Sequence, residues 1–321
     1  MLDKYFNKFN QINKKPGLFV FLIWLARGLI NPKWLDQKMI ERYFYVNTLK
    51  VQEHLSRYQL PEIEILFASK QEDFVILLES VQAAINMSIN PVRKVSVIVP
   101  ENDLNLCKKY FRDCVYLDKI VFIPETNIIS KKTIELIRNQ RPDRFGWILQ
   151  QVIVAEFILR SHCRNILVVD ADTILLRKKV WVDVNQNQIL MPTQEIHLPY
   201  YNFLSNVSKM YSIPNFSFVS HHLLVQTEVF RGIYDMFFGD INSALQKAFD
   251  LTKSNEPSPF DLKYEIYSQY LYKNFPERVE LVKWGNLTCP RREFDNFISS
   301  EKVRKILSIR YNSISFHHWN I

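Results

Sequence analysis

The chain has few cysteines, and their spacing argues against structural pairing. Its 321 residues include four cysteines, at positions 107, 114, 163 and 289, and none of them forms a C-x-x-C or another paired motif. We therefore expect ordinary reduced cysteines in a cytoplasmic protein. Internal repeats and low-complexity segments are absent as well.

Glycine-rich phosphate-binding motifs and long basic tracts are also missing. The first expected strand, 63–68, is not followed by a G-x-G-x-x-G turn, and the chain contains no P-loop. A classical dinucleotide-binding fold is therefore disfavoured. The 41 basic residues exceed the 33 acidic ones and give a net charge of +8. This mild excess suits an anionic substrate or an acidic membrane surface and does not indicate a nucleic-acid groove.

The apolar run near the N-terminus, Gly17–Ala26, is short and is interrupted by Arg27. It has about half of the roughly 20 residues that a membrane-spanning helix needs. It is not followed by an A-x-A cleavage site, which argues against a secretory signal peptide. Residues 1–60 are expected to form a helical extension that either packs on the main domain or lies in a membrane interface, peripheral to the inner membrane. A signal anchor is a third interpretation, which Arg27 disfavours.

Apolar residues are plentiful elsewhere, at 47% of the chain with 14% aromatic residues, and can form a sizeable core. From residue 61 onward, apolar runs that predict strands alternate with segments of helical spacing. This alternation predicts an α/β domain over residues 61–321, with a mostly parallel central sheet flanked by helices. Strands are expected at 63–68, 95–99, 120–123, 166–169, 188–192 and 216–225, with a strand near 314 returning to the sheet. Helices are expected to begin at Asp73 and at Thr227, and each of these two residues is the expected N-cap of its helix.

The stretch Ile166–Arg177 carries the main chemical signal. An unalternating β-branched run leads directly into Asp170 and Asp172, so the two carboxylates follow a strand buried on both faces. Open α/β sheets bind their ligands at this end of the strands. Two carboxylates separated by one residue suit a hard divalent cation that bridges to a phosphate. Asp170 and Asp172 are therefore the predicted metal ligands.

This block resembles the DxD motif of GT-A glycosyltransferases, which have a Rossmann-like fold. The resemblance implies Mn²⁺ or Mg²⁺ held against the diphosphate of a nucleotide sugar, with a UDP-sugar as the expected donor. In retaining members of the glycogenin and galactosyltransferase type, the helix before this strand helps to hold the donor, which here implies roles for Arg144, Gln150 and Gln151. Taken by itself, the pattern favours an amphipathic packing helix whose two glutamines are solvated.

The same resemblance implies further site residues. Ala68, Ser69 and Asp73, after the first strand, would contact the nucleotide. Of the adjacent histidines 221 and 222, only one can face the site if both lie on a strand, and His221 is preferred. A late histidine supplies a third metal ligand in several GT-A families, and here His317 is preferred over its neighbour.

Asp261 and Glu265 are spaced to share one face of a helix that begins near them. A carboxylate here is a candidate general base for an acceptor hydroxyl, or a sugar-binding group in a retaining enzyme. A capping Asp with a solvated Glu is the structural alternative. The segment also resembles a bacterial group of GT-A proteins associated with surface polysaccharides, which have Ser-Glu-Tyr-Glu at this point. Here the stretch reads Asp261-Leu-Lys-Tyr-Glu265, so only Tyr264 and Glu265 match directly, and the assignment of the base stays open.

The resemblance thus implies a metal-dependent hexosyltransferase that acts on a glycan or glycolipid acceptor in capsule or lipopolysaccharide synthesis. Two other classes stay open. A haloacid dehalogenase-like phosphatase would use Asp170 as nucleophile, but its motif normally lies on the first strand and requires a later lysine and an acidic pair. A glycan-binding protein without catalysis is the third class, and the intact Asp170 and Asp172 argue against it.

Overall fold

The computed structural model describes residues 59–193, 196–209, 211, 216–252, 256 and 258–317. Apart from residues 280–283, they belong to a compact unit that comprises residues 58–279 and 284–321. The predicted helical extension, residues 1–60, lies outside the described residues except for its last two. Among the described residues, no helix combines the length and apolar character that crossing a membrane requires.

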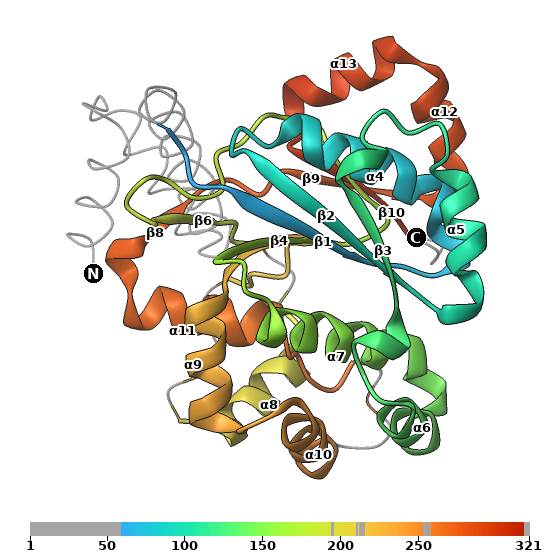
Figure 1. Ribbon diagram of the computed structural model, residues 1–321. Helices are drawn as coiled ribbons and strands as arrows, with labels where there is room; N and C mark the ends of the chain where they lie inside the picture. Colours follow the sequence, from blue (N-terminus) through green and yellow to red (C-terminus); the bar gives the residue numbers. More distant parts are fainter. Residues whose placement is uncertain are drawn as a thin grey trace, which may run out of the picture. The chain divides into compact units, whose positions relative to one another are not determined.

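A five-stranded sheet with the order β3-β2-β1-β4-β7 forms the centre of this unit (Figure 1). Its strands are β1 (Ile63–Ala68), β2 (Val92–Val99), β3 (Ile120–Pro124), β4 (Asn165–Val169) and β7 (His222–Gln226). All pairings are parallel except that of β4 with β7. Every residue of β1 and β4 is buried, as expected for strands covered on both faces. The predicted α/β class with a mostly parallel sheet is confirmed.

Helices cover both faces of this sheet (Figure 1). One face carries α4 (Phe74–Met87) and α5 (Leu104–Tyr110). The other carries α6 (Lys131–Gln140), α7 (Phe145–Arg160), α9 (Thr227–Phe237) and α11 (Tyr264–Asn274). Beyond them lie α8 (Leu198–Val207) and α10 (Ile241–Leu251). The segment that forms α8 has no clear periodicity in the sequence.

A second, three-stranded sheet has the order β5-β10-β9 and contains the end of the described chain. Its strands are β5 (Thr173–Leu175), β9 (Asn286–Pro290) and β10 (Ser313–His317). The expectation that the strand near residue 314 returns to the central sheet is therefore wrong. The remaining elements are β6 (Gln188–Leu190), β8 (Val279–Leu281), α12 (Phe294–Ser299) and α13 (Glu301–Arg310).

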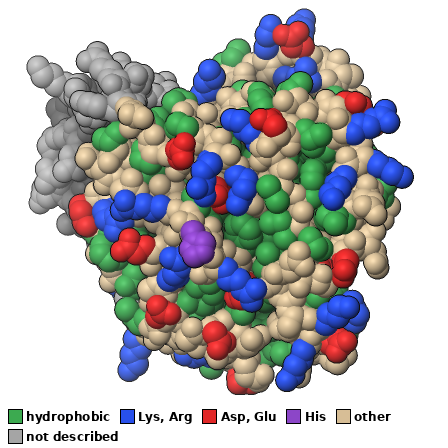
Figure 2. Space-filling model, in the orientation of Figure 1, with side chains coloured by type: hydrophobic (Ala, Val, Ile, Leu, Met, Phe, Trp, Pro, Cys, Tyr) green, Lys and Arg blue, Asp and Glu red, His purple; other side chains and the backbone are tan. Residues whose placement is uncertain are grey.

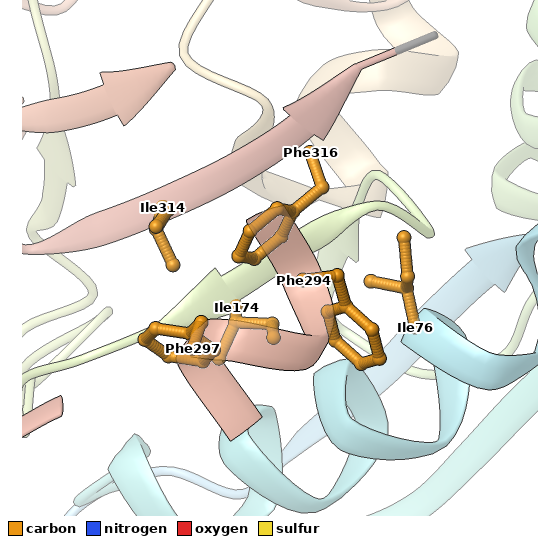
Figure 3. Close-up of a cluster of buried hydrophobic side chains, with 6 residues drawn as sticks. All are labelled: Ile76, Ile174, Phe294, Phe297, Ile314 and Phe316. Carbon is orange, nitrogen blue, oxygen red and sulfur yellow. The ribbon is translucent and has the colours of Figure 1, made fainter. Parts of the chain in front are cut away.

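Six apolar side chains join this second sheet to the helices around it (Figure 3). Ile174 on β5 and Ile314 and Phe316 on β10 pack with Phe294 and Phe297 of α12 and with Ile76 of α4. The rings of Phe294 and Phe297 lie 5.3 Å and 5.5 Å from that of Phe316, between centroids. Asp172 precedes β5 and His317 ends β10, so this cluster fixes the relative position of two predicted site residues.

Three local expectations need correction. The predicted strand 216–225 begins only at His222, because His221 has a φ of 62° and breaks the extended backbone. Thr227 is the first residue of α9 and its hydroxyl donates to the carbonyl of Cys163, so it does not cap the helix. Asp73 is at the N-cap position of α4, as expected, but its side chain makes no capping hydrogen bond and its carboxylate pairs with Arg291 at 2.7 Å.

Candidate active site

The site is built at the carboxyl end of β4, where Asp170 follows the last residue of the strand. The antiparallel neighbour β7 begins just beside it, and the backbone N–H of Asp170 donates to the carbonyl of His221 at 2.8 Å. The left-handed conformation of His221 turns its ring back toward this end, and its Nδ1 lies 3.2 Å from Oδ2 of Asp170. His221 therefore reaches the site from a turn and not from the strand that the apolar run predicts.

The Asp170 carboxylate is surrounded by donors. Lys263 places its Nζ 3.1 Å from Oδ1, and the hydroxyl of Tyr264 donates to the same oxygen at 3.0 Å. Burial alone would raise the pKa of Asp170, but Lys263 and His221 outweigh it and hold this pKa well below its usual range. Asp170 is thus ionised and paired. Its side chain is still 19% exposed, so a ligand can reach it.

Asp172 is paired with the predicted histidine at the end of β10. His317 Nδ1 lies 3.0 Å from Oδ2 of Asp172, and the backbone N–H of Phe316 donates to the Asp172 carbonyl at 2.9 Å. The rings of His221 and His317 are 5.0 Å apart between centroids. Asp170, Asp172, His221 and His317 therefore form one cluster drawn from three distant parts of the chain.

The donor chemistry of this cluster fits a divalent metal, but the present arrangement does not form a metal site. Two carboxylates and two imidazoles suit Mn²⁺, and the carboxylates suit Mg²⁺. Within the described ranges, however, no group of three or more His, Cys, Asp or Glu side chains is positioned to hold a metal ion. The contacts of Asp170 give a reason, since the ammonium of Lys263 already lies against its carboxylate.

Two side chains, one just before helix α7 and one within it, hold the segment 258–262, which leads to the site. The side chain of Gln151 is buried, accepts the N–H of Leu262 at 2.7 Å and lies 3.4 Å from the carbonyl of Phe260. Arg144 donates to the hydroxyl of Ser258 at 3.0 Å. A solvated Gln151 is therefore excluded. Both side chains anchor the segment that leads to Lys263, while Gln150 is only partly buried.

The residues predicted to contact a nucleotide lie at the same edge of the sheet. Leu66 of β1 pairs with Val168 of β4, and continuing this parallel register places Ala68 level with Asp170. Ser69 follows, and its hydroxyl donates to the neighbouring carbonyl of Lys70. Further on, Asp73 is held by Arg291 in the ion pair described above.

Asp261 and Glu265 are buried, and their carboxylates accept hydrogen bonds from other groups of the protein. Asp261 Oδ1 accepts the backbone N–H groups of Lys263 and Glu265 at 3.2 Å and 2.7 Å, at the start of α11. Glu265 Oε1 accepts the hydroxyl of Tyr201 at 2.9 Å and the N–H of Phe218 at 2.7 Å. Asp261 thus caps the helix as in the structural alternative, but Glu265 is fully buried and not solvated.

Three residues at the site, Lys263, Tyr264 and Trp284, were not predicted from the sequence. Lys263 and Tyr264 contact Asp170 directly, and the Trp284 ring lies 5.8 Å from that of His221 while its Nε1 donates to the carbonyl of Ser220 at 2.9 Å. For Lys263 a signal was present, namely the replacement of an acidic residue in the resembled Ser-Glu-Tyr-Glu segment. Trp284 gave no such signal.

Comparisons with known proteins find similar structures and no similar sequences. A scan against models of protein families gives no match, and a search of curated proteins gives none either.

Solved structures that resemble this chain include the apo form of mouse xyloside xylosyltransferase 1, at 10% identity and a TM-score of 0.44 over 80% of this chain and 98% of that one. The galactosyltransferase LgtC in complex with donor and acceptor sugar analogues matches at 11% identity and a TM-score of 0.39, over 79% of this chain and 86% of that one. The mannosyltransferase Ktr4p of S. cerevisiae matches at 9% identity and a TM-score of 0.45, over 70% of this chain and 74% of that one.

Proposed function

We propose that this protein is a glycosyltransferase that moves a sugar from a nucleoside diphosphate donor to a hydroxyl acceptor. The observation that supports this most directly is the convergence of Asp170, Asp172 and His317 at the carboxyl end of the central strand β4. A compact pair of carboxylates with a neighbouring imidazole matches the chemistry of a cation-assisted diphosphate site. The end of β1 supplies the adjacent edge where a nucleotide would lie.

In this proposal, Asp170, Asp172 and His317 would hold Mn²⁺ or Mg²⁺, which when bound neutralises the negative charge of the leaving diphosphate. His221 orients Asp170 through the contact between Nδ1 and Oδ2. Ala68 and Ser69 flank the nucleotide. Asp261 and Glu265 keep the start of α11 in place, because Oδ1 of Asp261 and both carboxylate oxygens of Glu265 accept hydrogen bonds from within the protein. We therefore do not assign either of them as the base.

The acceptor in this proposal is a glycan or glycolipid of a bacterial cell surface, and the donor is a UDP-sugar. Both follow from the resemblance of the DxD block and of the α11 segment. Basic and acidic side chains are interspersed over the face shown in Figure 2, with apolar side chains between them.

The test is a thermal shift titration with UDP, GDP and CMP, each with and without Mn²⁺. Ligands that bind the native state raise its melting temperature by mass action. We expect one nucleoside diphosphate to shift the wild type in the presence of Mn²⁺, and Asp172→Asn to lose this shift. The control is Asp113→Asn, because the side chain of Asp113 is 86% exposed in another part of the surface. Absence of any nucleotide shift in the wild type would overturn the proposal.

One observation favours a phosphatase as the second candidate. Lys263 contacts Asp170, as the lysine of a haloacid dehalogenase-like site would contact its nucleophile. The position of Asp170 after β4, the fourth strand of the described residues, argues against it. Hydrolysis of p-nitrophenyl phosphate that is lost in Asp170→Asn, together with no response to nucleotides, would favour the phosphatase.

A further inference from the structure

We propose that Lys263 and a divalent metal compete for Asp170, so that Lys263 is an internal cation that must be displaced before the metal can bind. This rests on the proposed function, since that function supplies the metal and the diphosphate. The proposal concerns the side chain of Lys263, which the sequence pattern alone does not place in the site.

Lys263 is held against Asp170 by its place in the fold. It immediately precedes α11, and its backbone N–H donates to Oδ1 of Asp261 at 3.2 Å. The ammonium lies 3.1 Å from Oδ1 of Asp170 and 4.5 Å from the centroid of the Tyr264 ring. The side chain is only 8% exposed. A buried ammonium between a carboxylate and an aromatic face is a well-formed cation site.

The carboxylate of Asp170 cannot pair with the ammonium of Lys263 and bind a metal ion at the same time. A metal bound to Asp170 would lie within a few ångströms of the ammonium, and two cations this close in a poorly hydrated site repel each other strongly. Without Lys263, no ammonium lies against Asp170, and the two carboxylates keep their contacts with His221, Tyr264 and His317. Lys263 therefore lowers the affinity of the site for a metal ion in the absence of a donor.

A bound diphosphate offers the displaced ammonium a new partner. Lysine has a flexible four-carbon stem and a compact charge, so its ammonium can leave a carboxylate and pair with a phosphate oxygen nearby. Metal and diphosphate should then bind with positive coupling, because each favours the state in which Lys263 has left Asp170. By linkage, each ligand raises the affinity for the other by the same factor.

Mn²⁺ binding followed by electron paramagnetic resonance tests this directly, on the full chain, with Mn²⁺ alone and with Mn²⁺ in the presence of UDP. For Lys263→Gln we expect Mn²⁺ alone to bind about tenfold more tightly than in the wild type, because a positive charge is removed beside the ligand oxygens. UDP should increase Mn²⁺ affinity more in the wild type than in this variant. Lys263→Arg retains the charge and should behave like the wild type.

Lys305→Gln is the matched control, because it removes the same charge from a side chain that is 76% exposed. The proposal is overturned if Lys263→Gln and the wild type bind Mn²⁺ alone equally, or if the wild type binds it more tightly. Thermal melts of all variants show whether each one is folded, and Lys263→Arg provides a second comparison. The Mn²⁺ titration tests whether Lys263 competes with the metal even if no nucleotide binds. If no nucleotide binds, that result contradicts only the proposed transferase function.

Discussion

Two aspartates near Lys263 have pKa values that are shifted in opposite directions. Lys263 and His221 overcome the effect of burial at Asp170 and keep its pKa low. At Asp261, burial and the nearby charge of Glu265 dominate, and they raise the pKa from 3.8 to about 7. The ionised Asp170 is suited to a cationic ligand, and Asp261 is suited to holding the start of α11.

The raised pKa of Asp261 predicts a specific dependence of stability on pH. Between its unfolded value of 3.8 and its folded value of about 7, the folded chain binds more protons than the unfolded chain. The contribution of Asp261 to the free energy of unfolding therefore falls as pH rises through this range. Asp261→Asn should lack this contribution, so the free energy of unfolding of the wild type relative to the variant should decline from pH 4 to pH 7. Urea unfolding at several pH values checks this.

Asp113→Asn serves as the control, because its side chain is 86% exposed and should leave the profile unchanged. A constant difference between the wild type and Asp261→Asn over this pH range would contradict the prediction.

At the residue scale, the sequence could identify the carboxylates but not their partners. Asp170, Asp172 and His317 stand out because they interrupt or end apolar strands. Lys263 lies 93 residues from Asp170 along the chain, and nothing local in the sequence indicates that an ammonium and a carboxylate meet. The contact depends on the start of α11, which Gln151 anchors at a sequence separation of 111.

The strands β5 and β10 are the elements that bring Asp172 and His317 together. Their polar faces meet through the hydroxyls of Thr173 and Ser315, which are 2.8 Å apart. Their apolar faces join the cluster in Figure 3, in which Phe316 is fully buried. The geometry of the site is therefore coupled to the packing of one aromatic side chain next to His317.

Phe316→Ala should destabilise the protein by about 3 kcal/mol, because it leaves a cavity between α12 and β10. It should also weaken the Mn²⁺-dependent nucleotide response, since the backbone that holds His317 is no longer packed. Denaturant unfolding gives the first quantity and the thermal shift titration gives the second. Ile306→Ala on α13, where the side chain is 55% exposed, is the control and should change stability by less than about 0.5 kcal/mol. A loss of stability with an unchanged nucleotide response would show that the packing of this cluster does not control nucleotide binding at the site.

At the scale of elements, the prediction succeeded where periodicity was strong and local. The strands β1 to β4 and the helices α4 and α7 follow from runs of apolar residues and their spacing. No element was predicted for α8, whose Tyr201 and Phe203 are buried in a segment of mixed polarity. The prediction also extended β7 too far, because the positive φ of His221 is a tertiary feature that an apolar run does not reveal.

Across the whole molecule, a second buried cation shapes the dependence of stability on pH. Lys179 is 5% exposed, and burial together with Arg177 lowers its pKa from 10.5 to about 7. Between these values the unfolded chain binds more protons than the folded chain, so the free energy of unfolding should rise with pH. Lys179→Met should be more stable than the wild type at pH 7 and should lose this rise up to pH 10. Chemical denaturation from pH 7 to pH 10 measures both effects.

Lys305→Met is the control, because the Lys305 side chain is 76% exposed and should keep the slope of the wild type. If the free energy of unfolding of Lys179→Met still rises with pH, groups other than Lys179 cause the pH dependence.

The distances along the chain between the paired site residues have a consequence for folding kinetics. Asp172 and His317 are 145 residues apart, and β10 must be placed between β5 and β9 before they can meet. Contacts of such high sequence separation close slowly, although the entropic cost of the longer loop grows only with the logarithm of its length. In refolding experiments, helical circular dichroism should therefore recover first, and Mn²⁺-dependent nucleotide binding should return in the slowest phase. The ability to bind a donor would then report that the last long-range contacts have formed.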